Sequence, residues 1–269
     1  MLATLREIFQ ENWMWRRQIL NLALIDLRKR VRGAVLGWTW LFVKPLVYIL
    51  VFWFALELGL RAGSTTGDYP YILWLSSGII PWFFMQSMLN TGSNIYRRYP
   101  FLVNRIHFPL SAISNFYALA ELIVFLCLMA GLLLVCLVTG VQLTVYALQL
   151  PLIWAMMFVF WVCFSVMTSP LSAISKDFSN LLKAFSTPLF WVSGVIYNVA
   201  NLDIPLLHYV MAFNPITFFV TASRAALCEK FWIWDKPEFL LPFLLVFALT
   251  ALVALRNYHK LRKDVADVI

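Results

Sequence analysis

Six apolar windows constrain this chain more than any other feature of its sequence, because each is about long enough to cross a lipid bilayer as a helix. They run approximately over residues 36–60, 71–88, 111–138, 145–171, 178–197 and 239–255. A transmembrane helix needs roughly 20 mostly apolar residues. Hydrophobic residues make up 62% of the 269 residues and charged residues 13%, which leaves too little polar surface for a soluble domain. We therefore predict an all-α integral membrane protein with six transmembrane helices.

The chain is expected to form a single domain, with an arm at residues 1–33, the six-span bundle at residues 34–256 and a tail at residues 257–269. The fifth window differs from the others because it carries Lys183 near one end and Pro188 inside. We expect Lys183 to reach the membrane interface and the helix to bend. The first apolar run begins too late and is too long for a cleavable signal peptide, so the chain should anchor itself.

Positive charges fall in alternate polar segments between these windows. Lys and Arg gather in the arm, the second break, the fourth break and the tail, at Arg6, Arg16, Arg17, Arg28, Lys29, Arg30, Arg32, Arg97, Arg98, Arg105, Lys176, Lys183, Arg256, Lys260, Arg262 and Lys263. Short loops rich in these residues stay in the cytoplasm, so both termini are expected there. The net charge of +8 follows from this rule and from the attraction of anionic membrane lipids, and it does not indicate nucleic-acid binding.

The sequence lacks the motifs of common catalytic and cofactor sites. It contains no Gly-Lys pair, which excludes a P-loop, and no Gly-x-Ser-x-Gly or His-Glu-x-x-His motif. The three histidines lie far apart, and three of the four cysteines fall inside apolar windows, so neither a metal site nor a disulfide framework is expected. We predict that the chain is not an enzyme and that nucleotide energy comes from another polypeptide.

The arm begins with a helical pattern. Leu5, Ile8, Phe9 and Trp13 recur at helical spacing, while the polar positions fall on the other face. This pattern predicts a helix that lies in the membrane interface. Its charged face is either merely solvated or holds a partner, and the candidate partner contacts are Arg6, Glu7 and Glu11.

The second polar break, residues 94–109, reads NIYRRYPFLVNRIHFP and alternates basic with aromatic residues. Pro100 and Pro109 mark the ends of what we predict to be a short helix of about two turns. Such a helix can transmit force by fitting into a groove of a soluble partner, although it could also be a surface helix with topology charges. The candidate coupling residues are Arg97, Arg98, Tyr99, Pro100 and Arg105.

Two carboxylates and a long external segment complete the functional candidates. Glu57 is expected at the outer interface, whereas Glu121 lies deeper and should face protein or water, in a structural, pore-lining or catalytic role. Residues 198–238 are largely apolar and are broken at Asn214 and Pro215. This break predicts a pair of re-entrant helices that form an external gate. Arg224 could there meet an exiting ligand or pair with an acidic side chain.

Several strings, in this order and spacing, resemble the permease subunits of type-2 ABC exporters that move O-antigen, capsule or teichoic acid polymers. They are DLRKRVRGAVLGWTWLFVKPLVYILVF (26–52), GIIPWFF (78–84), NRIHFP (104–109), KDFSN (176–180), SGVIYNV (193–199), FNPITFF (213–219) and RKDVADVI (262–269). The resemblance covers nearly the whole chain. One departure is Gly194, where many members have proline, so a helix break stays possible but its geometry is in doubt.

The resemblance implies a homodimer in the bacterial inner membrane, bound on the cytoplasmic side by two ATPase subunits that hold ATP and Mg²⁺. The transported molecule would be an undecaprenyl-linked polysaccharide. The arm would then be the interface helix, and residues 96–108 the coupling helix.

Aromatic residues, 17% of the chain, suit a polysaccharide channel because rings offer sugars an apolar surface without strong hydrogen bonds. The candidate channel residues are Tyr48, Phe52, Trp53, Glu121, Phe185, Phe190 and Trp191. The same rings could hold a drug, a lipid or haem, so an exporter of small molecules is an alternative. A membrane transferase acting on polyprenyl-linked sugars is another, but it should display clustered Asp, Glu or His at one membrane face.

Overall fold

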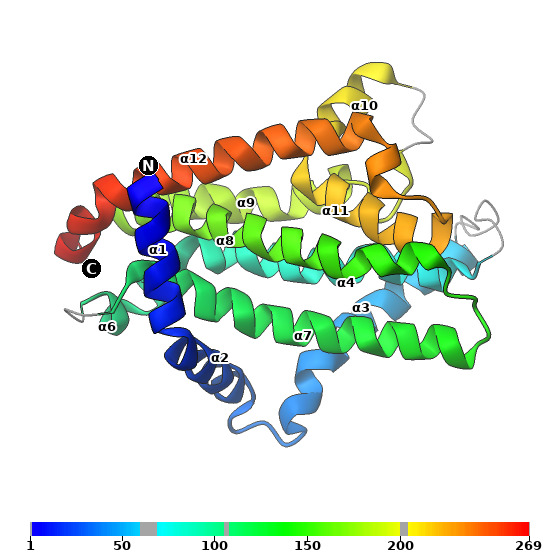
Figure 1. Ribbon diagram of the computed structural model, residues 1–269. Helices are drawn as coiled ribbons and strands as arrows, with labels where there is room; N and C mark the ends of the chain where they lie inside the picture. Colours follow the sequence, from blue (N-terminus) through cyan, green and yellow to red (C-terminus); the bar gives the residue numbers. More distant parts are fainter. Residues whose placement is uncertain (1, 60–68, 105–107, 200–203, 269) are drawn as a thin grey trace.

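The computed structural model describes residues 2–59, 69–104, 108–199 and 204–268 of the chain, and 86% of these described residues are helical, with no strand among them. Both termini lie at the same end of an elongated helical bundle, which we call the terminal end (Figure 1). An even number of crossings requires this arrangement. The opposite end, called the far end, carries the turn between α7 (Leu110–Val138) and α8 (Leu150–Ile174).

Five stretches are long and apolar enough to cross a membrane: Gly37–Gly59, Tyr71–Arg98, Leu110–Val138, Val145–Ile174 and Pro237–Leu261. They contain α3 (Trp40–Trp53), α4 (Tyr71–Asn90), α7, α8 and most of α12 (Pro237–Val268). Five of the six predicted windows are thus confirmed as helices of this length and composition.

The remaining window, the fifth along the chain at residues 178–197, overlaps α9 (Lys176–Val192), which is a helix of 17 residues with Lys183 in an exposed position. At 1.5 Å per residue it is roughly 26 Å long, slightly less than the hydrocarbon core of a bilayer. The count of six crossings therefore stays a prediction.

Proline and glycine mark the ends of several helices, as their backbone preferences require. Pro70 and Pro109 stand in extended conformation directly before α4 and α7. Gly140 follows the end of α7 with a φ of +75°, and Gly194 follows the end of α9 with a φ of +72°, a region that favours glycine. The helix break at Gly194 thus exists, and its geometry is that of a left-handed C-terminal glycine rather than a proline kink.

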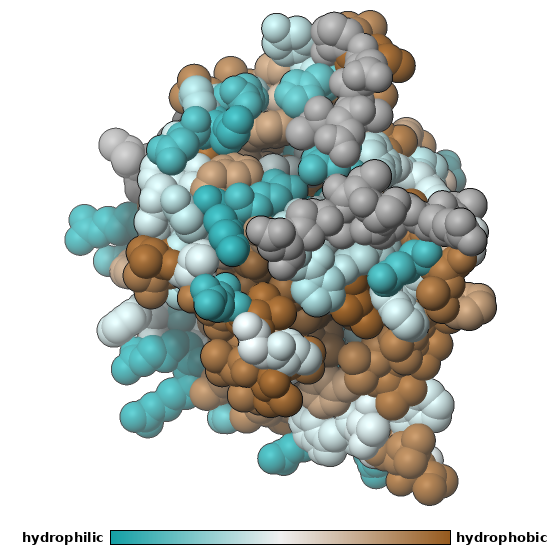
Figure 2. All heavy atoms as spheres, turned by 90° about the vertical axis from the view of Figure 1, so that its right-hand side faces the viewer, coloured by the Kyte–Doolittle hydropathy of each residue, from teal (hydrophilic) through white to brown (hydrophobic). Residues whose placement is uncertain are grey.

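The long helices differ in how much of their surface the bundle covers. Of an 18-residue apolar window in the stretch that contains α4, 78% is buried inside the molecule, whereas in the stretch that contains α3 only 11% of such a window is buried. Helix α4 is therefore the central element, and α3 lies on the outside with its apolar side chains exposed. Figure 2 shows the far end, where hydrophobic side chains cover the lower centre and right and polar ones gather toward the upper left.

The predicted break in the external segment occurs where expected, between α10 (Pro205–Ala212) and α11 (Pro215–Arg224). The axis bends by 89° at this point, so the pair is either one broken span or a re-entrant loop. Asn214 caps α11 by accepting a hydrogen bond from the Ile216 amide at 3.0 Å. Phe218 of α11 stacks on Phe243 of α12 at 3.9 Å between ring centroids, which holds α11 inside the bundle.

The arm consists of two helices rather than one, α1 (Leu2–Met14) and α2 (Arg16–Val31). Helix α1 crosses the terminal ends of α7 and α12, and α2 turns away along the side of α7 (Figure 1). At the junction, the Trp15 ring packs edge-on against Phe108, with 5.2 Å between ring centroids. The chain direction thus changes where an aromatic side chain can anchor the turn.

Candidate coupling network and translocation surface

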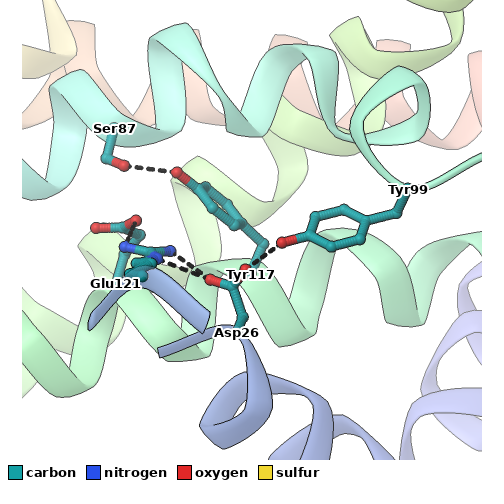
Figure 3. A network of polar contacts seen from close by, with 6 residues as sticks. Asp26, Ser87, Tyr99, Tyr117 and Glu121 are labelled. Atoms are coloured by element: carbon teal, nitrogen blue, oxygen red, sulfur yellow. Dashed lines mark hydrogen bonds and ion pairs between the residues drawn. The ribbon is translucent and has the colours of Figure 1, made fainter. Parts of the chain in front are cut away.

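A buried cluster of polar side chains joins the arm to the bundle, and we call it the Arg30 cluster (Figure 3). Its members are Asp26, Arg30, Tyr99, Tyr117 and Glu121. Arg30 binds Asp26 with N···O distances of 2.6 and 2.8 Å and binds Glu121 at 2.5 Å. The Tyr99 hydroxyl donates a hydrogen bond to Asp26. The cluster therefore connects α2 with α7 and with the segment between α5 (Ile95–Arg98) and α6 (Pro100–Val103).

Tyr117 extends this cluster toward the central helix. The guanidinium of Arg30 lies 5.3 Å from the centroid of the Tyr117 ring. The Tyr117 hydroxyl in turn lies 2.7 Å from the hydroxyl of Ser87 on α4. Contiguous polar contacts therefore connect the arm to α4.

Charge interactions within the cluster stabilise the protonated forms of Arg30 and Tyr99. Burial alone would lower the pKa of Arg30, but Glu121, Tyr117 and Asp26 more than offset this effect, so that pKa lies above its usual range. Burial and the hydrogen bond to Asp26 raise the pKa of Tyr99 to about 12. At neutral pH, Arg30 is therefore charged, and Tyr99 keeps the proton that it donates.

A second set of contacts fixes α5 between the ends of α4 and α8. The carbonyl oxygen of Gly92, in the turn before α5, lies 2.6 Å from the Ser165 hydroxyl and 2.9 Å from the Ser169 hydroxyl of α8. Arg97 donates to the Ala173 carbonyl at 2.8 and 3.2 Å. Because this carbonyl belongs to the last turn of α8, Arg97 satisfies one of the helix-end acceptors. The segment is therefore attached to two helices of the bundle.

The structure differs from the predicted two-turn coupling helix. Helix α5 ends before Tyr99, and α6 begins at Pro100 and has only four residues. Proline lacks an amide hydrogen and disfavours helical backbone in the residue before it, so the chain bends at Tyr99. This bend directs the Tyr99 side chain into the Arg30 cluster.

The other coupling candidates have different surroundings. Arg98 and Pro100 are exposed, as is the Phe101 ring, which lies 5.8 Å from the Lys29 ammonium. Arg105 lies outside the described residues. The exposed surface of this segment is thus formed by a cation, a proline and an aromatic ring.

On the arm, Arg6 and Glu7 are exposed, whereas Glu11 is half-buried. Glu11 accepts hydrogen bonds from Ser111 at 3.1 Å and from Tyr258 at 2.7 Å. Glu11 therefore ties α1 to α7 and α12 in this chain.

The outer face of α1 carries large side chains around an open groove of about 650 Å³. Phe9 stacks on Trp13 with 6.5 Å between ring centroids. The Arg16 guanidinium lies 4.7 Å from the Trp13 ring. Exposed aromatic and arginine side chains of this kind are enriched at protein interfaces.

Four of the predicted channel residues come together on α3 and α9. Phe52 lies 5.3 Å from Tyr48, 5.3 Å from Phe190 and 6.3 Å from Trp191, between ring centroids. Tyr48 and Trp191 are about half exposed, at 48% and 54%, whereas Phe190 is buried. We call these four residues the ring surface.

Three other channel candidates lie elsewhere. Trp53 is half-buried and Phe185 is 52% exposed, and within the described residues neither has a ring contact with the ring surface. Glu121 belongs to the Arg30 cluster, and its ion pair there favours the structural role among the alternatives. The channel role of all these residues stays a prediction.

Arg224, a candidate gate residue, is buried with its charge directed at backbone carbonyl groups. It donates to Gly194 at 2.6 Å, to Val195 at 2.5 Å and to Tyr197 at 3.3 Å. Its guanidinium also lies 3.5 Å from the centroid of the Trp74 ring. Arg224 therefore fastens the segment after α9 to α4 and α11.

The other gate candidates, Asn214 and Pro215, lie near the contacts of Arg224. Asn214 donates to the Ser193 hydroxyl at 2.7 Å, and Pro215 occupies the first turn of α11. Both side chains thus fix the bend between α10 and α11. A gating role is not tested by these contacts and stays a prediction.

Sequence reasoning treated Asp26 and Arg30 only as part of a basic run, although they are central to the cluster. One signal was present: an acid and an arginine four residues apart on a helix lie on the same face. Tyr99 was a candidate for a partner contact and instead faces inward. Tyr117 was not identified, because its partners are distant in the sequence.

Comparisons with known proteins point to one family. The sequence profile of the ABC-2 type transporter family matches residues 17–228, a stretch that contains both the Arg30 cluster and the ring surface. The chain is 20% identical over 230 residues to the O-antigen export system permease protein RfbA of Myxococcus xanthus, covering 85% of each chain. It is also 20% identical over 245 residues to a protein of the same name from Klebsiella pneumoniae, covering 91% of this chain and 92% of the relative.

Proposed function

This chain belongs to the family of ABC-2 type transporters, and on that premise we propose that it is the permease subunit of an ATP-driven exporter of lipid-linked polysaccharide. The polymer would be of the O-antigen, capsule or teichoic acid type and would cross the bacterial cytoplasmic membrane. The similarity to two O-antigen export permeases over more than four fifths of each chain is the observation that carries this proposal.

The energy would come from a partner ATPase that binds ATP and Mg²⁺, in two copies on a homodimer of this chain. Two exposed elements at the terminal end suit such a partner. They are the aromatic face of α1 around Phe9 and Trp13, and the Arg98 to Phe101 surface. Aromatic and arginine side chains are common anchors of protein interfaces.

Closure of the ATPases would be transmitted by the internal contacts of these same elements. Tyr99 connects the segment of α5 and α6 to Arg30 through Asp26, and Arg97 connects this segment to the end of α8. A chain of hydrogen bonds and ion pairs of this kind can carry coupling between sites when its elements move together. The proposed path leads from the ATPase surface through α5 and α2 into α4, α7 and α8.

The ring surface would form part of the wall along which the polymer moves. Tyr48 and Trp191 expose about half of their rings, so a second copy of the chain could complete the wall opposite them. Rings bind sugars through apolar faces, which allows a polymer to slide past without strong directional bonds. The bent pair of α10 and α11 would act as the gate at the far end, with the cytoplasm at the terminal end.

Replacing Arg98 with glutamate is expected to reduce the amount of polymer exported per ATP hydrolysed about tenfold. A reversed charge at the rim of an interface places like charges opposite each other and weakens the contact with the partner. The amount of folded protein should not change, since Arg98 is exposed. The measurement is ATP turnover and polymer export by the complex of this chain with its partner ATPase.

The matched control is Arg97→Glu, which places a carboxylate against the Ala173 carbonyl. This variant should lower the yield of folded protein itself. If Arg98→Glu exports polymer at the normal rate with normal ATP turnover, the assignment of this segment to coupling is wrong.

A further inference from the structure

Two adjoining cavities form a crevice between α3, α4 and α7. The cavity nearer the terminal end has a volume of about 620 Å³, and the one that continues toward the far end has about 520 Å³. Ile80 and Leu128 line both cavities, so the two are neighbours. The crevice arises because α3 packs loosely on the bundle. A ligand could therefore lie along α3 with its two ends in different surroundings.

The two ends of the crevice differ in polarity. The first cavity is lined by the cationic side chains of Arg30, Lys44 and Arg98 and by the carboxylate of Glu121. The second is lined almost entirely by apolar groups, among them Leu50 and Val135. A cationic end followed by an apolar groove complements a molecule with an anionic head and a hydrocarbon chain.

Lys44 is the most informative of these residues. It lies within the apolar stretch Gly37–Gly59, where a charged side chain is costly and usually marks a function or a partner. Its side chain is exposed rather than buried in an ion pair. The exposed ammonium of Lys44 can therefore contact a phosphate at the membrane interface.

Asn90 adds an independent sign of a ligand at the same end. Its amide nitrogen donates to Ser186 at 3.1 Å, but its buried carbonyl oxygen has no hydrogen-bond partner among the described residues. Buried acceptors are nearly always satisfied. A head group with hydroxyl hydrogens would supply the donor.

The apolar half of the crevice lies on a different face of α3 from the ring surface. Leu46 and Leu50 line the crevice, whereas Tyr48 and Phe52 point to the ring surface. In a helix, residues four apart share a face and residues two apart do not. A transported polymer would therefore not need to enter the apolar half, where an acyl chain could remain during transport. The cationic half adjoins the ring surface, because its Phe83 ring lies 5.7 Å from the Tyr48 ring between centroids.

We propose that the crevice holds one anionic phospholipid, with its phosphate among Arg30, Lys44 and Arg98 and an acyl chain in the apolar groove. The surrounding bilayer supplies this lipid continuously. Its phosphate contacts Arg30 and thereby joins the membrane interface to the Arg30 cluster. The proposal does not depend on which molecule the protein exports.

The test is native mass spectrometry of the full-length protein in detergent, with phosphatidylglycerol or phosphatidylcholine as the added lipid. The unmodified chain is expected to retain one phosphatidylglycerol and to lose phosphatidylcholine. Lys44→Gln should weaken phosphatidylglycerol binding about tenfold, because a charge-assisted hydrogen bond is lost. Lys183→Gln is the matched control, since this exposed lysine lies on α9 outside the crevice, and it should bind lipid normally.

A second pair of variants tests the apolar end. Gly131 lines the groove, and a β-carbon added there would meet nothing within 4 Å. Gly131→Leu should fill the groove and abolish retention of the lipid, whereas Gly131→Ala should leave retention unchanged.

Three results would overturn the proposal. One is equal retention of phosphatidylglycerol and phosphatidylcholine. Another is normal phosphatidylglycerol binding in both Lys44→Gln and Gly131→Leu. The third is copurification of a polyprenyl phosphate that phosphatidylglycerol cannot displace. The first two results do not test polymer export, which is measured separately, whereas the third would assign the crevice to a lipid of the kind that carries the proposed polymer.

Discussion

Replacing Arg224 with methionine is expected to lower the free energy of unfolding by about 3 kcal/mol or more, because buried acceptors left without a donor each cost about 1–3 kcal/mol. Arg224 donates to the backbone carbonyl groups of Gly194 and Val195, and both residues are buried. The substitution removes the donor and leaves these two buried acceptors without a partner. Thermal or denaturant unfolding of the purified protein in detergent measures this loss. Lys236→Met, at an exposed lysine, should change stability by less than about 0.5 kcal/mol.

Gly78 on α4 provides a second test of the position of the Arg224 guanidinium. A β-carbon at Gly78 would lie 2.5 Å from the Arg224 guanidinium and 3.1 Å from the Val195 carbonyl oxygen. Gly78→Ala should therefore destabilise the protein by about 2 kcal/mol, as overpacking does. Helix propensity alone predicts a gain of about 1 kcal/mol for glycine to alanine.

Gly131→Ala is the matched control, because Gly131 also lies in a long apolar helix but has open space around it. It should be neutral or stabilising. If both alanine variants stabilise the protein equally, the guanidinium does not occupy the position described.

Replacing Arg30 with methionine is expected to cost about 3–5 kcal/mol, because removing one partner of a buried ion pair leaves uncompensated charge. Here both Asp26 and Glu121 lose their cation. Beyond the loss of stability, the variant should hydrolyse ATP with its partner without exporting polymer, since the link between arm and bundle is broken. Stability and the ratio of export to ATP turnover are the two measurements.

Arg28 supplies the control for this experiment, as it lies on the same helix and is exposed. Arg28→Met should leave both quantities near normal. Adding Glu121→Met to Arg30→Met should recover part of the stability, because one of the unpaired carboxylates is then removed. A double variant as unstable as the sum of the single variants would contradict a direct Arg30–Glu121 pair.

The fold could be predicted to the extent that its signals are local. A window of apolar residues identifies a membrane helix wherever it packs, and five windows correspond to helices of sufficient length. The break at Asn214 and Pro215 could be located because proline and an N-terminal cap act on their immediate neighbours. Helix α9 could not be assigned as a crossing, because a 17-residue helix with Lys183 is compatible with more than one depth.

The site was less predictable, because its contacts join distant parts of the chain. Arg30 and Glu121 are separated by 91 positions, and neither residue type nor spacing indicates that they meet. Arg224 was expected to bind an exiting ligand or an acidic side chain, yet its donors point to backbone carbonyls, which carry no sequence signal. The ring surface could be predicted in part, because aromatic residues in the middle of apolar windows are visible in the sequence, but not which of them touch.

The most direct test of the proposed function is the amount of polysaccharide on the cell surface after deletion of the gene. We expect surface polymer to disappear, lipid-linked polymer to accumulate on the cytoplasmic side of the membrane, and both effects to be reversed by the unmodified gene. Surface polymer at its normal level in the deletion strain, with no polymer retained inside, would contradict the account.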